Sequence, residues 1–338
     1  HSGLISRIKI LFIAGDTYDH LLTHDDPNTL LIDNLIVTLF KQCERHGVVM
    51  RALRGTPSHD HQQTKRFEHL YKIGKFTFDF AYFDEVDVEH IESLDTSVLY
   101  VPDEYTATTQ ITQDIVKARM LAKGVERVDI ACMHGMFPHQ IDFKVKPTSV
   151  HDHEFYTSIV RYWILIGHIH KHSAYEKTLV PSSHDRLRMN EEDPKGFVVF
   201  TYKNEKPRFW FIENKLAHVH KTLQVYGTTV EEATKVVSDF LANQTERCFV
   251  RVEAETEHPL FSLFKDLSQK WPLHSIVPFP KSPKDKEEEL EVDEEDEKWE
   301  DQIPDTPERL KSLVFERLSE KHGTEQAERS VKLLESCL

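Results

Sequence analysis

The hydrophobic pattern at the start of the chain predicts a strand, a helix and a second strand in succession. Residues 9–14 are a short apolar run, which is typical of a buried strand. An amphipathic stretch follows from about residue 28 to Gly47, long enough for a helix of several turns. Residues 48–53 are again apolar apart from Arg51. Because this order usually forms a right-handed crossover, we expect two parallel strands in a layered α/β domain.

The first predicted helix has one apolar face and recognisable ends. Asn28 is the predicted N-cap, and Gly47 is the predicted stop. The apolar positions expected to face the core are Leu31, Leu35, Ile36 and Leu39. The later pattern predicts strands at 77–83, 97–101, 127–133 and 162–166, a helix at 107–123, and strands of a second sheet at 178–181 and 196–213.

From residue 214 the pattern changes, which divides the chain into further parts. Residues 214–277 are predicted to form a small α+β domain, with strands at 217–225 and 248–254 and helices at 229–243 and 258–270. Residues 278–304 are rich in proline and acidic residues, so a disordered linker is expected there. Residues 305–338 contain two short amphipathic helices, which bury too little surface to fold alone and need a partner.

Composition and charge restrict the class of protein. The 338 residues are 39% hydrophobic and 29% charged, with no apolar run of the roughly 18 residues that a membrane span needs. The four cysteines form no CxxC pair, so we expect reduced thiols in a cytoplasmic protein. The net charge of −15 does not exclude DNA as a partner, because residues 285–301 alone contribute −10.

Four short polar segments follow predicted strands and carry the candidate chemistry. They are Gly15–Asp19, Gly55–Asp60, Met133–Gly135 and Gly167–His170. Ligand sites of α/β sheets gather beyond the carboxyl ends of the strands, so these segments can meet in space. A carboxylate that bridges two cations, with imidazoles to complete each shell, suits a two-metal centre for phosphodiester hydrolysis.

Together the four segments resemble the motifs of the calcineurin-like metallophosphoesterases, which run D-x-H, G-D-x-x-D/H, G-N-H-D/E, a lone His and G-H-x-H. The resemblance implies that Asp16 bridges two ions and that the remaining ligands are Ser58, His134, His168 and His170. It also implies that His59 protonates the leaving oxygen, and Asp60 is expected to orient His59. Asp19 is either an orienting residue beside a metal-ligating histidine or a simple turn residue.

Residues 181–197 (PSSHDRLRMNEEDPKGF) carry a narrower resemblance, to the SbcD family of DNA repair nucleases. Its Ser-Ser, Arg-Leu, acidic and Lys-Gly-Phe positions all recur here. The resemblance implies a four-layer metallophosphoesterase β-sandwich flanked by helices, with a smaller α+β domain that caps the DNA site. It further implies two divalent metal ions, with Mn²⁺ favoured over Mg²⁺, and a homodimer. It also implies a partner, an SbcC-type ATPase with a coiled coil that binds residues 305–338. The location implied is the cytoplasm of a bacterial or phage-infected cell.

Two departures from the family pattern leave alternatives open. The D-x-H motif is absent, and only HSGLISRI precedes the first strand, so we expect that the sequence starts after that motif. Ser58 stands where the family has Asn. The leading hypothesis is a Mn²⁺-dependent exonuclease and endonuclease of an SbcCD-like complex. The alternatives are a phosphoesterase for nucleotides or phosphoproteins, and a scaffold subunit without activity.

Other histidine pairs share the H-x-H pattern without the neighbouring motifs. His151 and His153 are expected in a solvated loop, and His218 and His220 on an exposed sheet face.

Overall fold

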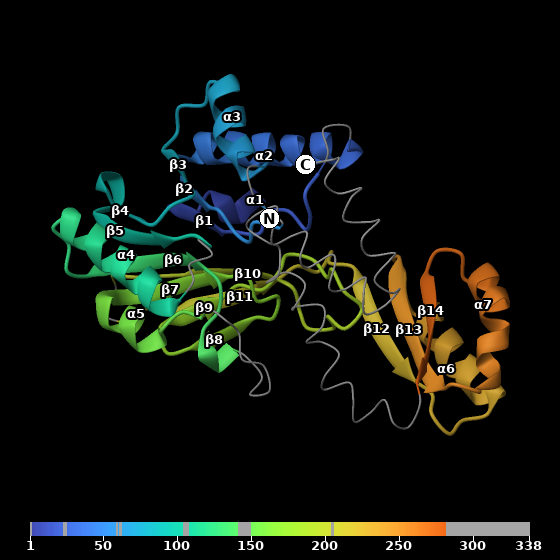
Figure 1. Cartoon of the computed structure of the whole chain (residues 1–338). Coiled ribbons are helices and arrows are strands. Elements are labelled where there is room, and N and C mark those ends of the chain that lie inside the picture. Colours follow the sequence, from blue (N-terminus) through green and yellow to red (C-terminus); the bar gives the residue numbers. More distant parts are fainter. Residues whose placement is uncertain are drawn as a thin grey trace, which may run out of the picture. The chain divides into compact units, whose positions relative to one another are not determined.

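The computed structural model describes residues 2–22, 26–58, 60, 63–103, 108–140, 150–203 and 206–281, and its class is α/β, as predicted (Figure 1). The expected general acid His59, the linker beyond residue 281 and the tail at 305–338 lie outside the described residues. No helix in the described part of the chain is both long enough and apolar enough to cross a membrane.

A three-stranded parallel sheet forms the first part of the fold. Its order is β1 (Ile10–Ala14), β2 (Val49–Leu53) and β3 (Phe80–Phe83), which confirms the predicted parallel pair. Helix α1 (Ser2–Ile5) precedes it, and helices α2 (Pro27–His46) and α3 (Arg66–Ile73) pack against one of its faces. Short 3₁₀ helices occupy Gln63–Lys65, Glu92–Leu94 and Pro138–Gln140.

Helix α2 differs from its prediction at the start and in its buried face. Asp26, not Asn28, is the N-cap, because its carboxylate accepts the Asn28 N–H and Pro27 fits the first helical position. The buried residues are Ile36, Phe40 and Cys43, whereas Leu31 and Leu35 are 66% and 67% exposed. The helix is turned so that Phe40 enters a cluster of aromatic rings: Phe67, Tyr71, Phe76, Phe78 and Phe80. The predicted end at Gly47 is confirmed by its left-handed φ of 64°.

The second sheet has six strands in the order β4-β5-β6-β7-β9-β8. Its strands are β4 (Asp87–Ile91), β5 (Thr96–Val101), β6 (Val128–His134), β7 (Val160–Gly167), β8 (Ser173–Tyr175) and β9 (Thr178–Val180). Strands β5, β6, β7 and β9 are parallel. Assigning residues 178–181 to a separate sheet was therefore wrong, since β9 pairs with β7 and continues its sheet.

Apolar cores line both faces of the six-stranded sheet. Helices α4 (Thr109–Ala122) and α5 (His153–Ile159) share one core with it. The other core joins it to the first sheet and to the antiparallel pair β10 (Gly196–Phe200) and β11 (Phe209–Glu213). These contacts bring the ends of β1, β6 and β7 together.

A buried ion pair crosses between the β1-β2-β3 sheet and the six-stranded sheet. Arg51 on β2 is 2% exposed, and its guanidinium forms two hydrogen bonds with Glu89 on β4, of 2.8 and 2.7 Å. Asp79 also pairs with it, and Tyr100 donates to the Glu89 carboxylate at 2.9 Å. The buried positive charge of Arg51 is thus compensated by the carboxylates of Glu89 and Asp79.

Residues beyond 214 form a three-stranded sheet with helices on one side. Strands β12 (Val219–Gln224), β13 (Cys248–Glu255) and β14 (Ser275–Lys281) share a core with α6 (Val230–Ala242) and with the 3₁₀ turn Pro259–Leu263 that leads into α7 (Phe264–Lys270). The predicted linker start was wrong, because residues 278–281 belong to β14. Their prolines are tolerated because β14 is an edge strand.

Candidate metal centre

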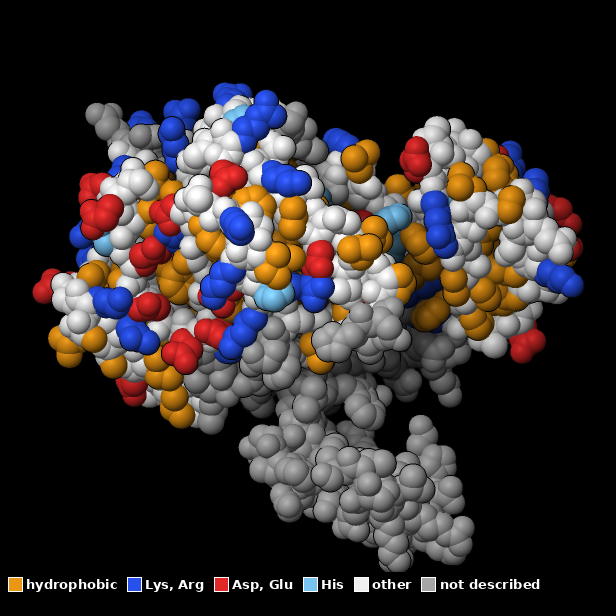
Figure 2. Space-filling model, turned by 90° about the horizontal axis from the view of Figure 1, so that it is seen from above, with side chains coloured by type: hydrophobic (Ala, Val, Ile, Leu, Met, Phe, Trp, Pro, Cys, Tyr) orange, Lys and Arg blue, Asp and Glu red, His pale blue; other side chains and the backbone are white. Residues whose placement is uncertain are grey.

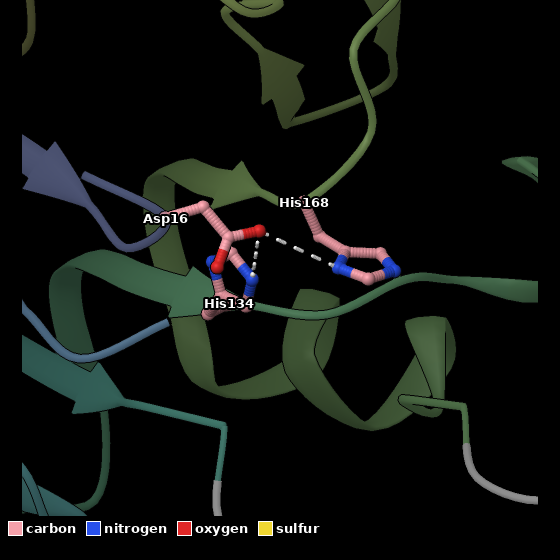
Figure 3. Close-up of side chains that lie close together, drawn as sticks. All are labelled: Asp16, His134 and His168. Carbon is pink, nitrogen blue, oxygen red and sulfur yellow. Dashed lines mark ion pairs between the residues drawn. The ribbon is translucent and has the colours of Figure 1, made fainter. Parts of the chain in front are cut away.

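Three of the predicted ligands meet at the carboxyl ends of three strands. Asp16 follows β1, His134 ends β6 and His168 follows β7 (Figure 3). One ligand atom from each lies within 4.8 Å of the others. Asp16 Oδ2 is 3.1 Å from His134 Nε2 and 3.8 Å from His168 Nδ1. Three segments that are far apart in the sequence thus form one cluster.

The backbone is strained where it presents these side chains. Asp16 has φ 47° and His168 has φ 100°, values that residues with a Cβ rarely adopt. Gly55 allows the loops to touch, since a Cβ there would lie 2.1 Å from the Asp16 N atom. Such strain persists only where the surrounding contacts impose it, and it is concentrated at functional sites.

His134 is held so that Nε2 faces the cluster. Its Nδ1–H donates to the Ala14 carbonyl at 2.7 Å, which fixes the ring and turns Nε2 toward Asp16. Burial lowers the pKa of His134, but the Asp16 carboxylate outweighs it and raises that pKa overall. Burial raises the pKa of Asp16. The two histidines and the Thr56 N–H lower it by more, so the pKa of the Asp16 carboxyl lies well below its usual range.

His151 contacts the backbone of His134, so the prediction that His151 lies in a solvated loop was wrong. Its Nε2–H donates to the His134 carbonyl at 2.8 Å, and its ring lies against Gly135. Burial lowers the pKa of His151, so the neutral ring is favoured. Of the second pair, His218 is exposed as expected, but His220 is 9% exposed and bonds the Arg188 carbonyl.

Thr56 also belongs to the centre, and the sequence did not single it out. Its N–H donates to Asp16 Oδ1 at 2.7 Å. Its hydroxyl oxygen lies 3.3 Å from Asp16 Oδ2, 3.2 Å from His134 Nε2 and 3.4 Å from His168 Nδ1. The available signal was its position, since Gly55-Thr56 follows β2 as Gly15-Asp16 follows β1.

Ser58 and Asp60 differ from the clustered ligands in their contacts. The Ser58 hydroxyl is buried and has no hydrogen-bond partner among the described residues. Asp60 is fully buried and accepts N–H groups from Thr17, Tyr18 and Gly55, which joins the two loops. Burial, and then the charge of Asp16, raises the pKa of Asp60 to about 6.

Asp19 is more exposed than the clustered ligands. Its side chain is 59% exposed, and its Oδ2 atom lies 3.5 Å from His20 Nδ1. The orienting role and the turn role of Asp19 both stay predictions.

His170 stands apart from the three clustered ligands and has its own support. Its Nδ1 is 2.7 Å from Glu191 Oε1, and the buried Lys195 ammonium bonds both Glu191 Oε2 and the His170 carbonyl at 2.7 Å. Burial raises the pKa of Glu191, but hydrogen bonds from His170 and Lys195 lower it to about 2. The network fixes the ring and leaves Nε2 free to bind an ion.

The donor set fits a divalent cation. Ligands about 2.1 Å from one ion lie roughly 3.0–3.4 Å from each other. The contacts of Asp16 Oδ2 and Thr56 Oγ1 with the histidines, at 3.1–3.8 Å, are close to this range. One carboxylate, two imidazoles and a hydroxyl suit Mn²⁺ or Zn²⁺. For a second ion, the described predicted ligands offer Asp16 and His170.

Comparison with known proteins assigns no family. The chain matches no protein-family model, and no curated protein matches its sequence. Its function must therefore be inferred from its own residues.

Replacing Glu191 with Gln is expected to weaken ion binding through His170. The buried Lys195 ammonium needs an oxygen partner, so the amide NH₂ of the new side chain is left to donate to His170 Nδ1. The ring proton then moves to Nε2, which cannot bind a cation. We expect the Mn²⁺ concentration for half-maximal binding to rise about 10- to 100-fold.

The matched control for this variant is Glu192→Gln. The Glu192 carboxylate bonds Lys221 and the Thr222 N–H instead of His170. Calorimetric Mn²⁺ titrations of both variants check the role of Glu191. Equal affinities in the two variants would show that Glu191 does not position His170.

Proposed function

We propose that this chain is a metal-dependent phosphodiesterase of the SbcD type that cuts DNA. The observation that carries the proposal is the meeting of Asp16, His134 and His168, with the Thr56 hydroxyl, at three strand ends. A second support is the Glu191–Lys195 network, because it lies in the 181–197 segment that resembles the SbcD signature.

The residues divide the proposed chemistry between them. Bound divalent ions supply Lewis acidity and positive charge at the phosphate. Asp16, His134 and His168 hold one ion, and His170 is proposed to bind the second together with Asp16. His59, outside the described residues, is proposed as the general acid that protonates the leaving oxygen. Asp60 joins the loop after Asp16 to Gly55 through its hydrogen bonds.

Surface charge is compatible with a centre that attracts phosphate through its ions. Among the described residues on the face in Figure 2, basic and acidic side chains are interspersed, and no broad basic surface forms there. We therefore propose that the ions provide much of the positive charge for the reacting phosphate.

The finer architecture and the partners belong to the same proposal. A four-layer sandwich is supported by the cores on both faces of the six-stranded sheet and on α2 and α3. The 214–281 domain is proposed to cap the DNA, and residues 305–338 to bind an SbcC-type ATPase. A homodimer is supported by the exposed Leu30, Leu31 and Leu35 of α2.

The test is hydrolysis by the protein expressed from its native gene. With Mn²⁺, we expect cleavage of end-labelled linear duplex DNA, and we expect EDTA to stop it. Hydrolysis of nucleotide monoesters or phosphopeptides without DNA cleavage would favour the alternative phosphoesterase. Mn²⁺ binding without any hydrolysis would favour the inactive scaffold.

A further inference from the structure

We infer that the Thr56 hydroxyl is a direct ligand of the ion held by Asp16, His134 and His168, in the place for which the sequence favours Ser58. The inference rests on the proposed metal centre. It concerns which oxygen completes one coordination shell, and it does not depend on the substrate.

The first argument is geometric. The Thr56 Oγ1 atom is 3.2–3.4 Å from one ligand atom of each of the three other residues. These separations match the roughly 3.0–3.4 Å between ligands that share one ion. The Thr56 oxygen is thus placed where it can share an ion with all three residues.

The second argument is the excess of lone pairs at this point. The His134 Nδ1 proton is committed to the Ala14 carbonyl, so in the neutral ring that a cation requires, Nε2 is an acceptor. Asp16 Oδ2 is an acceptor too. The Thr56 hydroxyl has one proton and lies near both His134 Nε2 and Asp16 Oδ2. It can donate to only one of them, so the other contact has no hydrogen atom between its two acceptors. A cation among these atoms satisfies every lone pair at once.

The third argument is preorganisation. The Thr56 N–H holds Asp16 Oδ1 at 2.7 Å, which leaves Oδ2 for the ion. Thr56 is 3% exposed, so its hydroxyl is removed from competing bulk water. The residue before a proline is restricted in its backbone, and Pro57 follows Thr56. The hydroxyl is therefore placed at the shell before any ion binds.

Ser58 lacks these contacts. Its hydroxyl is buried but has no hydrogen bond to Asp16, His134 or His168, all of which are described. No described contact therefore places the Ser58 hydroxyl in the shell, whereas three contacts place the Thr56 hydroxyl there.

Mn²⁺ binding by purified protein, followed by electron paramagnetic resonance of free Mn²⁺, tests the inference. Thr56→Val keeps the side-chain shape and removes the oxygen, so the affinity of one site should fall about tenfold or more. Thr56→Ser should restore the affinity, and Ser58→Ala should leave it unchanged. Wild-type affinity in Thr56→Val, or a loss confined to Ser58→Ala, would overturn the inference.

Cysteine replacement gives a second readout that does not depend on how Thr56→Val folds. A thiolate prefers soft cations, so Thr56→Cys should bind Cd²⁺ with the ultraviolet absorption of a cadmium thiolate. Ser58→Cys is the matched control and should show no such band. A band in Ser58→Cys alone would reverse the assignment.

The outcomes separate this inference from the proposed function. Mn²⁺ binding that depends on Thr56, without DNA cleavage, would leave the ligand assignment standing and reject the nuclease. DNA cleavage by a Thr56→Val protein with wild-type Mn²⁺ affinity would support the nuclease and reject Thr56 as a ligand. A wild-type protein that binds no Mn²⁺ would reject both.

Discussion

Replacing Asp16 with Asn is expected to abolish metal-dependent hydrolysis. Asp16 contacts both histidines and is the shared carboxylate of the proposed centre. Its charge should supply several kcal/mol of ion and transition-state binding, so kcat should fall about a thousandfold or more. The amide oxygen of Asn can still accept the Thr56 N–H, so the fold should remain.

The measurement is the rate of DNA cleavage across a Mn²⁺ titration, with circular dichroism to monitor folding. Asp114→Asn is the matched control, because it makes the same change at an exposed side chain on α4, outside the four site segments. Asp114→Asn should keep the wild-type rate. If Asp16→Asn also cleaves DNA at that rate, Asp16 is not a ligand of the catalytic ions.

Phe40→Ala should cause the largest loss of stability among the α2 residues. Phe40 is fully buried, and its ring centroid lies 5.1–6.1 Å from those of five aromatic residues. Removing it leaves a cavity that rigid rings cannot fill, so the free energy of unfolding should fall by about 3–5 kcal/mol. Urea denaturation followed by circular dichroism measures the change.

Leu121→Ala serves as the control for this variant. Leu121 is 83% exposed on α4, so its loss should change the free energy of unfolding by about 0.5 kcal/mol or less. Similar losses in the two variants would mean that the aromatic cluster does not stabilise the fold.

The sequence was sufficient where a local pattern determines the outcome. Strand β1 was recognised from its apolar run, and Gly47 from its place after an amphipathic stretch. The segments of Asp16, His134 and His168 were expected to meet because each lies at the carboxyl end of a strand. Their choice as ligands came from the resemblance to the metallophosphoesterase motifs.

Features that depend on tertiary contacts were missed. Leu31 and Leu35 have the same spacing as core residues, but the aromatic rings around Phe40 decide which way α2 turns. The start of the linker was placed too early because the prolines of β14 are unusual in strands and are tolerated there only at the edge of the sheet. A single threonine has no signature of its own, so Thr56 emerges only when three loops are placed together.

The Arg51–Glu89 ion pair has a consequence for the precision of the metal centre. Asp16 comes from one sheet, and His134 and His168 come from the other, so any sliding of the sheets changes the distances between ligands. Apolar side chains resist separation but permit sliding, because their attraction has no direction. A bidentate guanidinium–carboxylate contact is directional. The Arg51–Glu89 contact therefore resists sliding of one sheet along the other, and it helps to keep constant the distances between Asp16 and the two histidines.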